Sequence, residues 1–258
     1  MSQATADRRQ RILTELLDSK RVTVRELAEV MAVSEATVRR DLRELAHREE
    51  VTLVHGGATL PKNGDYSIQA KRLRHVEEKT RIGAVAAGLV QDGEQVFLDP
   101  GTTSFAMLDH LRRRRGVTII TNSIRLAGAL DGGGGTGPAA LLLGGQVRPD
   151  RMDAVGPLAL TVLEQLRGYS AFLGADGLTM EFGPSAADIE SAHLHRLVVQ
   201  HAREATLLVD HSKFETCSLF RIVEWERITR IVTDRPPTDA WRTFLDQHGV
   251  AVVVAEEE

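Results

Sequence analysis

The residue types best suited to contacting another molecule are concentrated in one short stretch of the N-terminal quarter of the chain. At about 100° per residue, Ala36, Arg40 and Arg43 fall on one side of a helix, flanked by Thr37 and Arg39. Arginine reads guanine edges or grips phosphate in a major groove, and a small residue such as alanine permits close approach. This helix face therefore predicts a surface that contacts DNA.

A second group of polar and small residues follows the apolar runs in the C-terminal two thirds of the chain. Small residues, hydroxyls and backbone amides at such positions form cradles for anions, because free N–H groups and peptide dipoles favour phosphate. Asp99, Asn122 and Asp176 can accept hydrogen bonds from sugar hydroxyls, and Lys213 can add a positive charge. The predicted effector-binding residues are Asp99, Gly101, Thr102, Thr103, Thr121, Asn122, Gly144, Gly145, Gly174, Asp176, Gly177 and Lys213.

Each of these loops taken alone has a simpler interpretation, a tight turn that needs glycine and a cap. Five such loops at one edge of one sheet favour a pocket over five unrelated turns.

Two short helices joined by a tight turn must position the arginine face. Thr23 and Glu26 predict a capping box at the start of the first helix, and Ser34 can cap the second. The first helix has the i, i+3, i+4, i+7 spacing of one apolar face in Val24, Leu27, Ala28 and Met31. The second has an inward stripe of Val38, Leu42 and Leu45. Capped helix, short turn and capped helix predict a helix-turn-helix.

The alternative interpretation is an ordinary surface helix whose arginines pair with Asp41 and Glu44. For a lone amphipathic helix this alternative would be favoured. The capped helix and short turn that precede it favour DNA binding instead.

The flanking segments complete a small domain and connect it to the remainder. Residues 7–17 predict a helix that covers the other two, because four apolar residues share one face: Ile12, Leu13, Leu16 and Leu17. Pro61, Asn63 and Gly64 lie in a stretch with little apolar content, which predicts a linker. We therefore expect a winged helix-turn-helix domain at residues 1–58, a linker at 59–75 and an α/β domain at 76–258. The segment from about residue 67 to residue 90 is predicted to be helical.

From Gln95 onward, short β-rich apolar runs alternate with helical stretches. Strands are predicted within residues 95–99, 117–121, 140–145, 170–175, 205–210, 227–234 and 250–255, with helices near 103–114, 124–130, 157–167, 187–203 and 238–247. Such alternation indicates βαβ units, a mostly parallel sheet and helices on both of its faces. Ligands of such sheets bind beyond the carboxyl ends of the strands, where the second group of polar residues lies.

Length and composition restrict the class of protein. A chain of 258 residues can form a small domain and a medium one, and its hydrophobic content of 42% is ordinary for a globular protein. The net charge of −4 excludes a uniformly basic nucleic-acid binder, so DNA binding must depend on how charges are segregated. No apolar run approaches the roughly 20 residues of a membrane span, and the N-terminus lacks the apolar core of a signal peptide. We expect a cytoplasmic protein with no membrane partner.

No cofactor or metal site is predicted. A single cysteine, Cys217, excludes an internal disulfide and a multi-cysteine metal site. His193 and His195 lie two apart on a predicted helix and do not share a face, so neither resembles a metal ligand. Residues 132–137 satisfy GxGxxG, but they follow a helix and precede a strand, the reverse of the nucleotide-binding context.

Two motifs near the N-terminus resemble a known family. The sequence ELAEVMAVSEATVRRDLREL at residues 26–45, followed by VHGGA at residues 54–58, is similar to the DNA-binding half of the DeoR family of bacterial sugar-metabolism repressors. The resemblance implies a β wing over residues 51–55 and DNA contacts from Ser34, Thr37, Arg39, Arg40 and Arg43. The family usually has glycine where Glu49 stands and often arginine where Leu53 stands. These departures affect the end of the second helix and a phosphate contact of the wing.

The C-terminal motifs extend this resemblance over nearly the whole chain. DPGTT, TNS, LLLGG, FLGADGL and DHSKF occur in the order and spacing of the DeoR-family sensor domain. The resemblance implies a fold similar to ribose-5-phosphate isomerase and a sugar phosphate or related metabolite as ligand.

Two functions are compatible with these features. The first is a transcriptional regulator, with operator DNA and a phosphorylated sugar as partners, acting as a dimer or tetramer because two-fold operators require at least two subunits. The second is a sugar-phosphate isomerase with an accessory domain. An isomerase needs a base and electrophilic help for an enediolate, and no paired acid and base stands out among Asp99, Asp176 and Lys213. The regulator, a protein that is not an enzyme, is the favoured interpretation.

Overall fold

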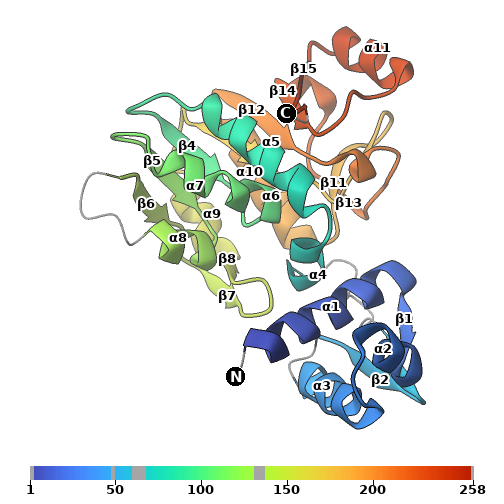
Figure 1. The fold of residues 1–258 in the computed structure, drawn as a ribbon. Helices are drawn as coiled ribbons and strands as arrows, with labels where there is room; N and C mark the ends of the chain where they lie inside the picture. Colours follow the sequence, from blue (N-terminus) through green and yellow to red (C-terminus); the bar gives the residue numbers. More distant parts are fainter. Residues whose placement is uncertain (1–2, 48–49, 60–67, 131–136, 257–258) are drawn as a thin grey trace. The chain divides into compact units, whose positions relative to one another are not determined.

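The computed structural model describes residues 3–47, 50–59, 68–130 and 137–256. The chain divides into two compact units, Met1–Val76 and Glu77–Glu258. Figure 1 shows helices and a small sheet in the first unit and a large sheet covered by helices in the second.

The first unit is a helix-turn-helix with a β wing. Its elements are α1 (Gln3–Ser19), β1 (Arg21–Thr23), α2 (Val24–Met31), α3 (Glu35–His47), β2 (Thr52–Val54), β3 (Gly57–Thr59) and α4 (Ile68–Leu73). The three strands form an antiparallel sheet in the order β1-β3-β2. The structure thus confirms the predicted helix-turn-helix and wing.

Local capping interactions set the limits of α2 and α3 as the sequence predicts. The Thr23 side chain accepts from the Glu26 amide, and the Glu26 carboxylate accepts from the Thr23 amide, which completes the capping box. Ala32 ends α2 in a left-handed conformation at φ 52°. The Ser34 hydroxyl then accepts from the Thr37 amide at 3.2 Å and caps α3.

The helices of the first unit enclose one apolar core. Ile12 and Leu16 of α1, Leu27 of α2, and Leu42 and Leu45 of α3 are each at most 2% exposed. Strand β1 was not predicted, because three residues give no periodic signal. Its pairing explains Gly57, since a Cβ there would lie 1.9 Å from the Val22 carbonyl oxygen.

The segment predicted to be helical over about residues 67–90 consists of two helices. The structure has α4 and a separate helix, α5 (Val76–Gly88), with His75 between them in a left-handed conformation at φ 52°. Only isolated residues adopt that conformation, so it ends a helix. Glu77 and Glu78 in the first turn of α5 favour a new start there, because they complement the helix dipole. Residues 60–67 of the expected linker lie outside the described residues.

The second unit is built on a seven-stranded sheet. Its strands are β4 (Gln95–Leu98), β5 (Thr118–Thr121), β6 (Ala139–Leu142), β9 (Ser170–Leu173), β12 (Glu204–Leu208), β14 (Arg230–Thr233) and β15 (Ala251–Val254). Their order is β15-β14-β12-β9-β4-β5-β6, and every pairing between them is parallel. The predicted parallel α/β architecture is confirmed.

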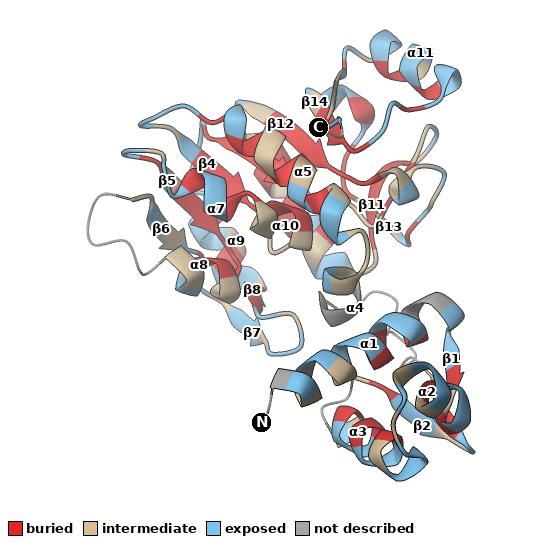
Figure 2. Cartoon of the chain, viewed as in Figure 1, coloured by how far each residue is buried: buried red, intermediate tan, exposed pale blue. Residues whose placement is uncertain are grey.

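Each face of this sheet has its own apolar core. Along β4, Phe97 packs into one buried cluster and Val96 and Leu98 into the other, because successive strand side chains face opposite sides. Figure 2 shows the buried strands between helices whose outer surfaces are exposed. The remaining helices are α6 (Thr102–Ala106), α7 (Leu108–Leu111), α8 (Ile124–Leu130), α9 (Pro157–Leu163), α10 (Ile189–His201) and α11 (Asp239–Gln247). The helix predicted near residues 103–114 is therefore two short helices.

Several short elements of the second unit were not predicted. They are the hairpin of β7 (Gln146–Arg148) and β8 (Asp153–Val155), the antiparallel sheet of β10 (Gly177–Thr179), β11 (Gly183–Ala186) and β13 (Phe220–Arg221), and two 3-10 turns, η2 (His211–Lys213) and η3 (Trp225–Arg227). With two to four residues each, they are too short for a periodic pattern.

The strand order defines a topological switch point between β4 and β9. After β4 the chain adds β5 and β6 on one side, and then places β9 on the other side of β4. In open parallel sheets, ligands bind outside the carboxyl ends of the strands at such a point. The loops after β4 and β9 are therefore the expected position of a ligand site.

An ion-pair network connects the β7–β8 hairpin to the start of α10. Arg148 contacts Asp153 at 2.6 Å and Asp188 at 2.8 Å, and Arg151 also pairs with Asp188. Burial acts to raise the pKa of Asp188. The Ser191 amide and the two guanidinium groups outweigh this effect and hold the pKa well below its usual range.

We expect Leu42→Ala to lower the free energy of unfolding of the first unit by about 2–5 kcal/mol, because it removes apolar volume from a site that is 1% exposed. Circular dichroism follows both units, whereas fluorescence of Trp225 and Trp241, the two tryptophans of the chain, follows only the second. Leu53→Ala, at a site that is 46% exposed, is the matched control. An equal loss in both variants would contradict the assignment of Leu42 to the core.

We expect the stability difference between wild type and Asp188→Asn to shrink as pH falls below about 4. The folded-state pKa of Asp188 lies below the unfolded value of about 3.9, so its stabilising contribution is present above that value and is lost as pH decreases. Urea unfolding at pH 7 and pH 3, followed by tryptophan fluorescence, measures this difference. Asp239→Asn, which removes an equal charge from a side chain that is 90% exposed, is the control. A constant difference for Asp188→Asn would refute the ion-pair explanation.

Candidate functional site

The outer face of α3 presents the residues predicted to contact DNA. Arg39, Arg40 and Arg43 are exposed, and Ala36 and Ser34 are exposed at the start of the helix. Thr37 is half-buried, and its hydroxyl lies 2.9 Å from that of Ser34. The opposite side of α3 packs into the core through Val38, Leu42 and Leu45. The structure therefore separates the arginines from the apolar stripe as the helical spacing predicts.

A buried carboxylate on α3 is neutralised from α1, not by the arginines of α3. Asp41 is 1% exposed, and its two oxygens accept from Arg8 Nε at 2.6 Å and Arg9 Nε at 2.9 Å. Arg39 pairs with Glu35 at 2.6 Å. Arg40 and Arg43 take part in no ion pair within the described part of the chain. Their charges are therefore available to a phosphate or a base edge.

The wing lies next to α3 in sequence and pairs β2 with β3. Gly56 adopts φ 76° in the turn between these strands, a conformation that favours glycine. Leu53 is 46% exposed on β2. Glu49, the other departure from the family pattern, lies outside the described residues.

The switch point in the second unit is organised by Asp99. Its carboxylate accepts from the Gly101 amide at 3.1 Å, from the Ser104 hydroxyl, and from the Gly174 amide at 2.9 Å. Gly174 follows β9, so one side chain joins the loops on both sides of the switch point. Asp99 is 3% exposed. These protein donors occupy the carboxylate that was expected to bind sugar hydroxyls, which favours a role in shaping the loops.

Thr121 and Asn122 extend this polar region beyond the end of β5. The Thr121 hydroxyl donates its hydrogen to the Leu98 carbonyl at 2.7 Å and accepts from the Ser123 amide, so it already has a donor and an acceptor partner within the protein. The Asn122 Nδ2 donates to the Ala154 carbonyl at 3.0 Å, but its buried Oδ1 has no hydrogen-bond partner in the described part of the chain. Asn122 is therefore a better candidate for a ligand contact than Thr121.

The predicted glycines differ in the atoms that would exclude a larger residue at each position. At Gly145 a Cβ would lie 2.4 Å from the Val155 carbonyl oxygen, and at Gly177 it would lie 2.2 Å from that of Thr216. Backbone packing alone explains both residues. A Cβ at Gly101 would meet the Asp99 carboxylate at 2.8 Å, whereas Gly144 has open space around it.

The other predicted residues lie around the same edge of the sheet. Thr102 and Thr103 begin α6 directly after the Asp99 loop, Thr102 half-buried and Thr103 buried. Asp176 accepts from the Ala187 amide at 2.8 Å. Lys213 is half-buried at the end of η2, after β12, and makes no ion pair with these residues. Five consecutive parallel strands of the sheet precede these loops: β6, β5, β4, β9 and β12. The five loops therefore lie at the same end of the sheet, the carboxyl end of its strands.

His195 also lies in this region, although the sequence did not predict it as an effector-binding residue. It is 7% exposed on α10, and its Nε2 lies 3.9 Å from Asp99 Oδ2. Its Nδ1 has no hydrogen-bond partner within the described ranges. Burial lowers the pKa of His195, although nearby carboxylates, Asp99 foremost, oppose the shift. The sequence holds a signal for it: His195 follows Ala192 by three positions and precedes Val198 by three, so it occupies an apolar position of the helix.

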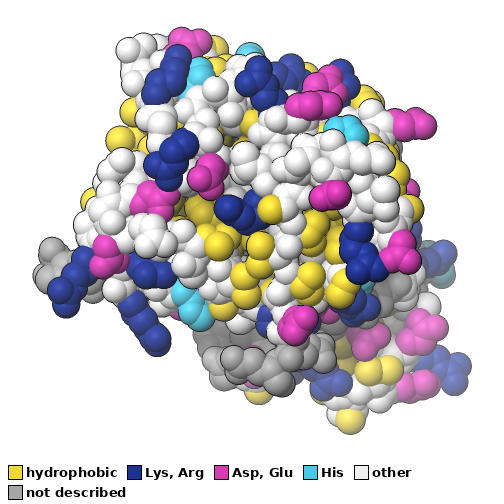
Figure 3. All heavy atoms as spheres, turned by 90° about the horizontal axis from the view of Figure 1, so that it is seen from above, with side chains coloured by type: hydrophobic (Ala, Val, Ile, Leu, Met, Phe, Trp, Pro, Cys, Tyr) yellow, Lys and Arg dark blue, Asp and Glu magenta, His cyan; other side chains and the backbone are white. Residues whose placement is uncertain are grey.

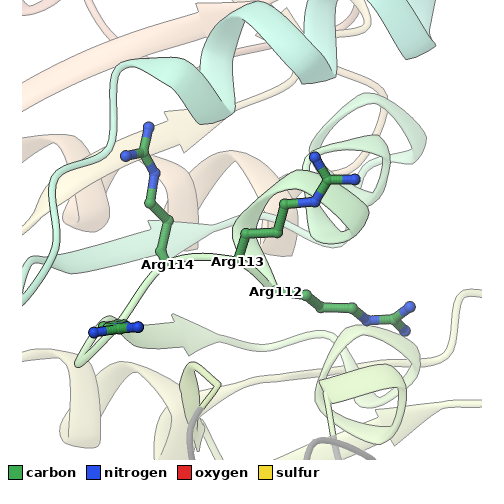
Figure 4. A pocket seen from close by; sticks show the side chains of 4 residues that line it. Arg112, Arg113 and Arg114 are labelled. Atoms are coloured by element: carbon green, nitrogen blue, oxygen red, sulfur yellow. The ribbon is translucent and has the colours of Figure 1, made fainter.

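A separate cavity of about 460 Å³ is lined by Arg112, Arg113, Arg114 and Arg115, in the turn before β5. In Figure 4 the side chains of Arg112, Arg113 and Arg114 point in different directions. Arg112 contacts Asp109 and the Ala129 carbonyl, and Arg114 donates to the carbonyls of Ala87 and Gly88. These contacts tie two of the arginines to the protein instead of directing them at one ligand.

The face of the molecule seen in Figure 3 carries positive and negative side chains intermixed with hydrophobic ones. Such a face has no extended region of one charge. None of the described helices is both long and apolar enough to cross a membrane.

Comparison with known proteins connects both units to one family. Residues 8–63 match the DeoR-like helix-turn-helix domain, and residues 74–235 match the DeoR C terminal sensor domain. The HTH-type transcriptional repressor GlcR of Bacillus subtilis is 35% identical over 254 residues, which cover 96% of this chain and 95% of that protein. The glycerol-3-phosphate regulon repressor of Escherichia coli is 29% identical over 230 residues, 89% of this chain and 90% of that protein.

A solved structure of ribose 5-phosphate isomerase from Plasmodium falciparum is 16% identical and covers 54% of this chain and 52% of that chain, with a TM-score of 0.36. This likeness is too remote to transfer an enzymatic activity, whereas the relatives that match nearly the whole chain are named transcriptional repressors. With an exposed arginine face on α3 and both family domains in order, the chain belongs to the DeoR family of helix-turn-helix transcriptional regulators.

Proposed function

We propose that this regulator is a repressor of an operon for sugar metabolism, that α3 enters the major groove of its operator, and that a phosphorylated sugar bound in the second unit controls it. The observation that carries the DNA-binding half of this proposal is the pair Arg40 and Arg43, exposed on α3 and free of ion pairs among the described residues. The names of the relatives, among them a glycerol-3-phosphate regulon repressor, support the sugar-related half.

The proposed ligand site is the polar edge of the sheet at the switch point. Asp99 shapes it by joining the loops after β4 and β9. We propose that Thr102, Thr103 and backbone amides of these loops contact the phosphate, and that Lys213 adds its charge. Glycines at positions 101 and 174 allow the loops to lie close to the Asp99 carboxylate.

The proposal includes a homo-oligomer, a dimer or a tetramer. A two-fold operator presents its half-sites one helical turn apart, so it requires at least two copies of α3. Binding of the phosphorylated sugar would then change the affinity for DNA by altering how the subunits present this helix. By reciprocal linkage, DNA must change the affinity for the sugar phosphate by the same factor.

The isomerase alternative has weaker support. An isomerase requires a free base next to the substrate carbon, whereas the Asp99 carboxylate accepts three hydrogen bonds from the protein. A carboxylate that is already hydrogen-bonded in this way is better suited to shaping a binding site than to removing a proton.

We expect Arg40→Ala to weaken operator binding without changing the fold. A base contact would cost about 1–3 kcal/mol at one operator position, and a phosphate contact would reduce the salt slope by about one. Titration of operator DNA at several salt concentrations measures both. Arg25→Ala is the matched control, since that side chain is 82% exposed on α2 and paired with Glu29. Unchanged binding by the Arg40 variant would remove this face of α3 from the groove.

We expect a sugar phosphate to raise the melting temperature of the second unit, by an amount equivalent to about 2.7 kcal/mol at one hundred times Kd. The parent sugar should do much less. Thr102→Val and Lys213→Met should each weaken this effect, the second more, because bonds to charged groups contribute about 1.5–3 kcal/mol. Tryptophan fluorescence is the readout.

The control for the charge is Lys20→Met, which removes an exposed lysine from the first unit. Neither Thr102→Val nor Lys213→Met should alter operator affinity without ligand, since both lie in the second unit. A full ligand effect on DNA affinity in both variants would place the sugar phosphate elsewhere. Isomerised product with no change in DNA affinity would support the enzyme instead.

A further inference from the structure

Two buried polar atoms near the switch point have no hydrogen-bond partner among the residues that the structure describes. They are Nδ1 of His195, a residue that is 7% exposed, and Oδ1 of Asn122, a residue that is 2% exposed. More than nine in ten buried polar groups in folded proteins are hydrogen-bonded. An unpaired atom at this depth is destabilising unless a ligand or a bound water satisfies it, so these two atoms point to a contact with a further molecule.

Asn122 and the helix that carries His195 both contact strand β8. The Asn122 Nδ2 donates to the Ala154 carbonyl on that strand at 3.0 Å, which fixes the amide and leaves Oδ1 on its other side. Helix α10, which carries His195, packs against the same strand, and Asp153 of β8 is one of the carboxylates that act on His195. Asp99 lies 3.9 Å from His195 Nε2, so the imidazole also borders the loop that organises the switch point.

The charges around His195 restrict the chemistry of that molecule. Four carboxylates act on the imidazole, those of Asp99, Asp176, Asp188 and Asp153. Arg148 and Arg151 pair with Asp153 and Asp188, while Asp99 and Asp176 accept from backbone amides. A phosphate in contact with the imidazole would be repelled by the carboxylates around it, whereas a neutral hydroxyl group would not.

Hydroxyl groups have the donor and acceptor properties that the two atoms need. Asn122 Oδ1 can only accept, and a neutral imidazole offers one donor and one acceptor nitrogen. A hydroxyl donates one hydrogen and accepts through two lone pairs, so the hydroxyls of a sugar have the chemistry that both residues need. Burial favours the neutral form of His195, because it lowers the pKa.

We propose that His195 and Asn122 recognise hydroxyl groups of the phosphorylated sugar and thereby determine which sugar the regulator binds. The hydroxylated end of the ligand then lies next to α10 and β8, and its phosphate lies toward Thr102, Thr103 and Lys213, as proposed above. This inference rests on the proposed function, since it assigns one end of the same ligand.

The test compares three variants of the full chain with wild type. His195→Leu removes both ring nitrogens at similar volume, His195→Gln keeps a donor and an acceptor, and His193→Leu changes an exposed histidine two positions away on the same helix. Calorimetry and tryptophan fluorescence measure binding of hexose 6-phosphates, pentose 5-phosphates, glycerol 3-phosphate, their monodeoxy analogues and inorganic phosphate.

We expect His195→Leu to bind the preferred sugar phosphate at least tenfold more weakly than wild type. Inorganic phosphate should bind wild type and this variant alike. His195→Gln should recover part of the loss, and His193→Leu should behave as wild type. A monodeoxy analogue that lacks the recognised hydroxyl should bind wild type and His195→Leu equally. Without ligand, the melting temperature of His195→Leu should equal or exceed that of wild type, because an unpaired polar group has been removed.

Three results would overturn the inference. If His195→Leu binds the preferred sugar phosphate as wild type does, the atoms are satisfied by ordered water only, and the proposed function stands. If the variant loses inorganic phosphate and every sugar phosphate to the same extent, His195 supports the fold instead of reading a hydroxyl. If wild type binds no sugar phosphate, the proposed effector fails and this inference fails with it. Should His195→Leu not fold, the comparison of His195→Gln with wild type across the deoxy analogues decides between the same outcomes.

Discussion

The DNA-binding unit depends on the charge of one buried carboxylate. Asp41 lies on the inner side of α3, and the guanidinium groups of Arg8 and Arg9 hold it from α1. A buried charge without its partner is costly, on the order of 3–5 kcal/mol, so this contact constrains how α3 lies against α1. It also leaves Arg40 and Arg43 of the same helix without an internal anion among the described residues. The segregation of charge that a protein of net charge −4 needs to bind DNA is thus achieved within one helix.

The second unit uses a carboxylate in a related way. Asp99 accepts from amides on both sides of the switch point and from the hydroxyl of Ser104, so it shapes the loops that a ligand would meet. Its oxygens are satisfied within the protein, whereas Asn122 Oδ1 and His195 Nδ1 are not. The same polar region therefore contains groups that hold the loops and groups that remain able to bind. In many binding sites, the side chains that contact the ligand are held in position by other side chains that bond only to the protein.

The features predicted correctly from the sequence are those set by local chemistry or by regular repetition. The capping box of Thr23 and Glu26 and the apolar stripe of α3 involve residues within two helical turns, so spacing alone determines them. The parallel sheet follows from its alternating apolar runs. The shorter elements escaped prediction, because β1 and the β7–β8 hairpin are stabilised by partners distant in sequence. The break at His75 escaped it because a left-handed residue that is not glycine leaves no compositional signal.

The roles of the site residues were also difficult to predict, because they depend on partners that are distant in sequence. The strand-end loops were predicted because each follows an apolar run, but the role of an individual side chain depends on contacts that spacing does not reveal. Asp99 and Thr121 were expected to face a ligand, yet their oxygens bond to the protein. His195 was considered only as a metal ligand, and its unpaired nitrogen becomes evident only when α10 packs beside Asp99.

In the function proposed here, the first unit binds DNA through α3 and the second unit binds a sugar phosphate at the switch point. Amide hydrogen exchange of the full chain tests it directly, measured alone, with a DNA fragment selected by the protein from a random library, and with a sugar phosphate. We predict that DNA slows exchange in residues 34–43 and 52–59, and that the sugar phosphate slows it in residues 99–104, 121–123, 174–177 and 189–195. Protection by DNA confined to the second unit, for example around residues 112–115, with α3 unchanged, would contradict the account.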